Sequence, residues 1–144
     1  LFEFDRAARG EAASVEAEAL WRRAAERPPV AYVEFHCYYQ DNRPSFRPYV
    51  FSSALHADAA RRERAEALAR RLLAIGTGPA VEVAPGDERF GRCLPYQLIE
   101  RFGTLAHFYK LHMRESMADN LAQAERVFRT VLEVLEHNPK EHGQ

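Results

Sequence analysis

The sequence predicts a single α+β domain, ordered α-β-β-α-β-α-α, in which four helices pack against a three-stranded sheet. Three observations predict it. Four segments repeat apolar residues at spacings of three and four, which is the helical period. Three short segments are rich in β-branched and aromatic residues, two of them with clear alternation. The chain has 144 residues, enough to bury a core without the help of metals or disulfides.

The first two long helices are expected over residues 11–27 and 57–75. Ser14 is a suitable N-cap for the first, and Pro28 ends it because the residue before a proline avoids helical angles. The second helix has Asp58 near its start and is followed by Gly76, a common C-cap.

Residues 30–40 and 45–52 are predicted to form a β-hairpin around a turn at residues 41–44. This register places Phe35 opposite Val50 and leaves one face of the pair apolar. Cys37 and Pro48 are paired on that same face, where we interpret Cys37 as a packing residue, and the proline places the second strand at the sheet edge. A helical crossover makes the third strand, residues 80–84, parallel to the second, so the predicted strand order is 2-1-3.

The C-terminal third is predicted to hold two helices. Pro95 suits the first turn of a helix running to about residue 115, with its apolar stripe continuing through Leu105 and Tyr109. Ser116 and Asp119 resemble a capping box that starts the last helix, which Asn138 and Pro139 end. We expect deep burial for one set of residues on these stripes: Phe35, Val50, Leu68, Leu72, Phe102 and Phe128.

Composition narrows the possible partners. Twenty basic and 21 acidic residues give a formal charge of −1, which lacks the basic excess of a general nucleic-acid binder. No apolar run approaches the ~20 residues that span a bilayer, so we expect no membrane association. Two cysteines suggest no disulfide framework and fit a reducing, cytoplasmic compartment. Because the first residue is Leu1, we expect a processed protein or a domain cut from a longer chain, with residues 1–10 and 140–144 loosely ordered.

The spacing of the histidines, cysteines and glycines does not favour a metal or cofactor site. Two helical histidines share a face only when they are three or four residues apart, and neighbours on a strand point to opposite faces. A site joining His36 and His56 stays open. No glycine-rich turn with a phosphate-binding lysine follows a strand, so we expect no cofactor. The sets excluded by spacing are His107 with His112, His137 with His142, and His36 with Cys37.

Cys93 is the candidate for an enzymatic function. It lies just before a predicted helix, where free amides lower a thiol's pKa, and Arg89 and Arg92 flank it. A small enzyme would use Cys93 as a thiolate nucleophile, with His36 or His56 as its base. The alternative is a semi-buried cysteine that only packs.

The outer face of the predicted hairpin is the candidate binding surface, because it carries aromatic and arginine residues that are enriched at binding hot spots. Either a helix of this chain or a partner covers it. We therefore expect a non-catalytic interaction or regulatory module, binding a protein partner or forming a homodimer through this face and the last two helices. Val127 and Val134 widen the apolar stripe of the final helix. The predicted binding residues are Tyr32, Glu34, His36, Tyr38, Arg47, Tyr49 and Phe51.

Overall fold

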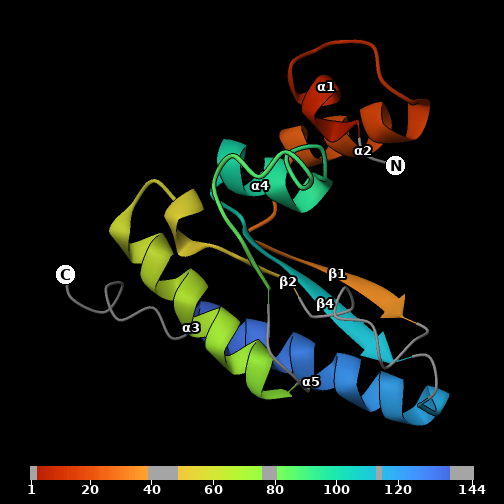
Figure 1. The fold of residues 1–144 in the computed structure, drawn as a ribbon, viewed down its shortest axis with the longest axis vertical. Helices are drawn as coiled ribbons and strands as arrows, with labels where there is room; N and C mark the ends of the chain where they lie inside the picture. Colours follow the sequence, from red (N-terminus) through yellow and green to blue (C-terminus); the bar gives the residue numbers. More distant parts are fainter. Residues whose placement is uncertain (1–2, 39–48, 76–80, 113–114, 137–144) are drawn as a thin grey trace.

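The fold mixes helices and short parallel strands, as Figure 1 shows. A computed structural model describes residues 3–38, 49–75, 81–112 and 115–136. The α+β class is confirmed. The helices are α1 (Phe4–Ala8), α2 (Val15–Glu26), α3 (Ala59–Ile75), α4 (Leu94–Phe102) and α5 (Met117–Glu136). The strands are β1 (Ala31–Tyr38), β2 (Tyr49–Phe51), β3 (Val81–Val83) and β4 (Leu105–His112), and a short 3-10 turn, Ser53–Leu55, follows β2.

The described strands form two parallel pairs, so the predicted 2-1-3 sheet is wrong. β1 pairs with β4, and Phe35 lies opposite Tyr109 instead of the predicted Val50. β2 pairs directly with β3, which confirms that these two strands are parallel but not that β1 separates them. The predicted hairpin turn, residues 41–44, lies outside the described residues.

β4 is the element that the sequence analysis assigned to a helix. The predicted helix over residues 95–115 instead ends at Phe102, because Gly103 adopts the left-handed region with φ 68°. The amides of Gly103 and Thr104 donate to the carbonyls of Ile99 and Leu98, at 2.8 and 3.3 Å. Residues 105–109 of β4 are all buried, as residues of parallel strands usually are, and so this part of the strand shows no regular alternation of polar and apolar residues.

The two faces of the β1–β4 pair are covered by different helices (Figure 1). Val33 and Phe35 of β1 pack on the side of α3 and α5, around the buried Leu72 and Val127. Tyr32, which directly precedes Val33 and lies on the opposite face, packs on the side of α4. A third apolar cluster joins α4 to α1 and α2, so α4 lies between that helical pair and the strands. The predicted division of β1 into two faces is therefore confirmed.

Three helix starts agree with their sequence signals. The Ser14 side chain accepts a hydrogen bond from the Ala17 amide at the start of α2. Asp58 accepts one from Arg61 before α3, and Ser116 accepts one from Asp119 before α5. Residues 1–10 were expected to be loosely ordered, but Phe4–Ala8 forms α1, and the Phe4 amide donates to the Arg92 carbonyl at 3.1 Å. Residues 140–144 lie outside the described part of the chain.

The core prediction holds for α3 and fails for α5. Leu68 and Leu72 are buried, whereas Phe35, Val50 and Phe102 are only partly covered. Phe128 is 54% exposed, because α5 turns a different side toward the core. That side carries Val127, Val131 and Val134.

Candidate functional site

Alternate residues of β1 form a hydrogen-bonded polar row on the α4 side of the sheet. The Glu34 carboxylate accepts hydrogen bonds from the Tyr32 hydroxyl at 3.3 Å and from His36 Nε2, which lies 2.6 Å away. The His36 ring meets Phe108 edge-on, with ring centroids 4.9 Å apart. The structure thus confirms that Tyr32, Glu34 and His36 share one face. Their polar groups pair with one another and remain partly accessible to solvent.

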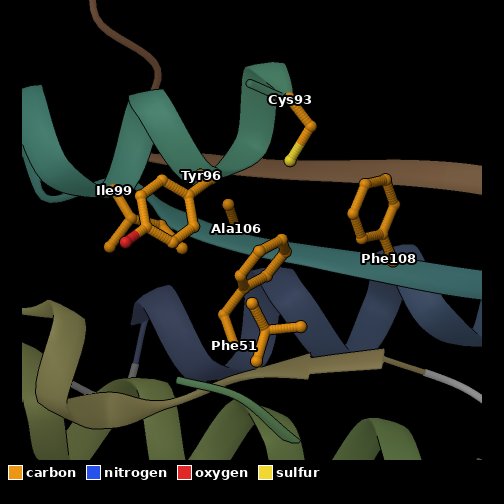
Figure 2. Packing of buried hydrophobic residues seen from close by; sticks show 7 residues of the cluster. Phe51, Cys93, Tyr96, Ile99, Ala106 and Phe108 are labelled. Atoms are coloured by element: carbon orange, nitrogen blue, oxygen red, sulfur yellow. The ribbon is translucent and has the colours of Figure 1, made fainter. Parts of the chain in front are cut away.

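Cys93 lies above this row, at the N-cap of α4, and it is only 3% exposed. Figure 2 shows its sulfur directed toward the strands, in the cluster that contains Tyr96 and Phe108. Burial raises the pKa of the Cys93 thiol to about 12, and the nearby Glu34 carboxylate adds to the increase. The flanking Arg89 does not offset this, because its guanidinium pairs with Asp87 at 2.6 Å. This environment is the reverse of the activated thiolate that the sequence suggested.

Phe51 belongs to the same apolar cluster and not to an open binding face. Its ring lies 5.4 Å from that of Phe108, between the strand pairs (Figure 2). The predicted hairpin register, with Phe35 opposite Val50, also places Phe51 opposite Glu34, but in the structure Phe108 lies opposite Glu34. The side chains of Cys37, Tyr38, Arg47 and Tyr49 lie outside the described part of the structure. Among the predicted binding residues that are described, those nearest α4 are therefore covered by the chain's own helix.

Two other histidines are buried at separate positions. His107 on β4 faces α3 and α5, and its pKa falls to about 4 because burial disfavours the charged ring. Burial likewise lowers the pKa of His56, with Arg61 adding to the decrease. Within the described ranges, no three His, Cys, Asp or Glu side chains gather as a metal site.

Two hollows in the surface lack the residues that the enzyme hypothesis needs. One, of about 500 Å³, lies between the β2–β3 pair and α3, where Ser53 donates to Glu66 at 2.8 Å. The other, of about 310 Å³, lies beside Arg61, which donates to the Phe102 carbonyl at the end of α4. The residues lining both hollows include neither cysteine nor histidine.

The most unusual surface is on α5, where four large apolar side chains are exposed in one row. At 100° per residue they fall within an arc of about 60°. We call this row the α5 stripe, and it consists of Met117 (75% exposed), Leu121 (63%), Phe128 (54%) and Leu132 (57%).

The α5 stripe extends toward β1, because the Phe128 ring lies 5.5 Å from the ring of Phe35. Exposed apolar residues on α2 form no comparable row, since Val15 and Leu20 lie about 140° apart around that helix. The sequence predicts deep burial for Phe128 and treats Val127 and Val134 as an addition to the apolar stripe, whereas both valines are buried and Phe128 is exposed. The structure reverses these roles. The sequence shows that α5 has more apolar residues than one core contact needs, but it does not show which of them face the core.

Charged residues border the α5 stripe on its solvent side. Glu125 and Arg129 form an ion pair at 2.7 Å, one helical turn apart, and both are exposed. Among the described residues, no helix is long and apolar enough to cross a membrane. No protein-family model, curated protein or solved structure matches this chain.

Proposed function

We propose that this chain is a non-catalytic interaction module that self-associates through the α5 stripe. The observation that carries the proposal is the alignment of four large apolar side chains, each more than half exposed, on one side of α5. Single exposed apolar residues are ordinary on protein surfaces, whereas a contiguous row of them is typical of an interaction site.

The border of the stripe favours a second copy over a strongly charged partner. Glu125 and Arg129 place one charge of each sign beside the stripe. A surface of a single sign would select an oppositely charged protein, but a mixed border can complement itself across a two-fold axis. The buried thiol of Cys93 gives the enzyme alternative no comparable support.

The proposal is tested by light scattering from micromolar to submillimolar concentration. We expect the mass of the wild-type protein to rise from one chain toward two. Leu132→Glu should keep the protein at the mass of one chain, because the carboxylate would be buried without a partner. The matched control is Leu20→Glu on α2, where the replaced leucine is 54% exposed and belongs to no stripe.

Circular dichroism and thermal melting establish that both variants fold. A wild-type mass of one chain at every concentration would refute self-association. Equal loss of the dimer in the Leu20→Glu and Leu132→Glu variants would show that the contact does not depend on the α5 stripe.

A further inference from the structure

We infer that two copies of this chain pair their α5 helices in antiparallel orientation, with Glu125 and Arg129 selecting that orientation. The inference rests on the proposed function and adds the geometry of the contact. The α5 stripe spans residues 117–132 of a helix of 20 residues, so the stripe is about 23 Å long and the helix about 30 Å. Two such helices overlap completely only when the two-fold axis crosses their midpoint, between Arg126 and Val127.

This axis produces favourable contacts between the two stripes. It places Leu121 at the same height as Leu132 of the second copy. Phe128 then lies within about one residue's rise of Ala124 of the second copy, and this small side chain leaves room for the ring. Large side chains thus meet either an apolar residue or a gap, as close helix packing requires.

The charged border of the stripe distinguishes antiparallel from parallel pairing. In the antiparallel pair, both borders lie on the same side of the contact. Glu125 then lies within about one residue's rise of Arg129 of the second copy, so each carboxylate has two guanidinium groups nearby. In a parallel pair, the two borders lie on opposite sides and do not meet. Only the antiparallel arrangement therefore makes association depend on these two charges.

The dimer should be weak and reversible. One helix face buries less than the roughly 800 Å² per partner of a standard protein interface. Exposed ion pairs add little affinity, but like charges held side by side oppose association. We therefore expect the charges of Glu125 and Arg129 to determine the orientation of the two helices more than the affinity of the dimer.

The test uses two charge reversals, first separately and then mixed. Arg129→Glu leaves two acidic residues on the border of each copy, and Glu125→Arg leaves two basic ones. We expect each variant alone to associate at least about tenfold more weakly than wild type, measured by sedimentation equilibrium. An equimolar mixture should recover dimers to within about threefold of the wild-type dissociation constant, because acidic and basic borders then face each other.

Arg23→Glu is the matched control, since Arg23 is an exposed arginine that pairs with Glu26 on α2. It should dimerise like wild type. If both border variants dimerise like wild type while Leu132→Glu stays monomeric, the antiparallel geometry is refuted and self-association through the stripe stands. Variants that weaken association without recovery in the mixture would also refute the geometry. A wild-type protein that never dimerises would refute the proposed function itself.

Discussion

Helices α4 and α5 both carry apolar residues on more than one side, yet the fold treats them differently. α4 has nine residues, and the six from Leu94 to Ile99 are buried, because the strands cover one side and α1 and α2 cover the other. α5 has 20 residues, of which only Val127, Val131 and Val134 are buried. An apolar surface beyond one core contact therefore indicates a second contact without saying whether it lies within the chain. In α4 the second apolar side is covered by α1 and α2 of the same chain, whereas in α5 it is exposed to solvent.

The largest expected effect concerns the thiol at the start of α4. With a pKa of about 12, Cys93 holds about a thousandfold less thiolate at neutral pH than an ordinary thiol near 8.5, and only the thiolate is alkylated. We expect iodoacetamide to modify Cys93 at least about a thousandfold more slowly than a cysteine introduced at Leu132 on α5. Peptide mapping by mass spectrometry follows each site separately. Rapid native-state alkylation of Cys93 would revive the enzyme hypothesis.

A second comparison replaces one leucine on each helix by alanine. Leu98 of α4 is buried between α1, α2 and the sheet, so Leu98→Ala should reduce the free energy of unfolding by about 2 to 5 kcal/mol. Leu121 of α5 belongs to the exposed stripe, and Leu121→Ala should change it by no more than about 0.5 kcal/mol. Urea denaturation of dilute protein measures both values without a contribution from association. Similar losses for the two variants would mean that the α5 stripe is covered within the single chain.

The elements that could be predicted from the sequence are those marked by local chemistry. Ser14, Asp58 and Ser116 mark helix starts because a capping side chain acts within one turn of the backbone. Alternation separated the two faces of β1 for the same reason, since it depends only on neighbouring residues.

Strand pairing was not accessible in this way. β1 pairs with a strand more than 70 residues away, and no local pattern encodes that choice. The spacing of Leu105 and Tyr109 fits both a helix and one face of a strand, and Gly103 was the overlooked signal that a helix ends there.

In the candidate site, too, local patterns were predictable and tertiary packing was not. That Tyr32, Glu34 and His36 share a face followed from alternation, but the packing of Tyr32 against α4 depends on the tertiary fold. The pKa of Cys93 was misjudged because its sequence neighbours suggested an exposed loop, whereas burial dominates the observed shift. On α5, valines and larger apolar residues form adjacent rows, and periodicity alone does not show which row meets the core.

The third prediction tests the covered side of α5 through His107, which lies on β4 beneath α3 and α5. Its pKa is about 4 in the folded protein and about 6.5 in an unfolded chain, so the unfolded state binds the proton more tightly. Folding stability should therefore fall as the pH decreases from 6.5 to 4, by about 3 kcal/mol from this residue.

Urea denaturation at pH 7 and pH 4 measures the loss, and His107→Leu should reduce it by about that amount because leucine takes up no proton. The lowered pKa of His56 acts in the same direction and remains in both proteins, so the difference between them isolates His107. If His107→Leu is folded and loses as much stability on acidification as wild type, His107 is in contact with solvent. In that case the valine side of α5 would be accessible to solvent as well as the stripe. The helix α5 would then differ from α4 on both of its sides.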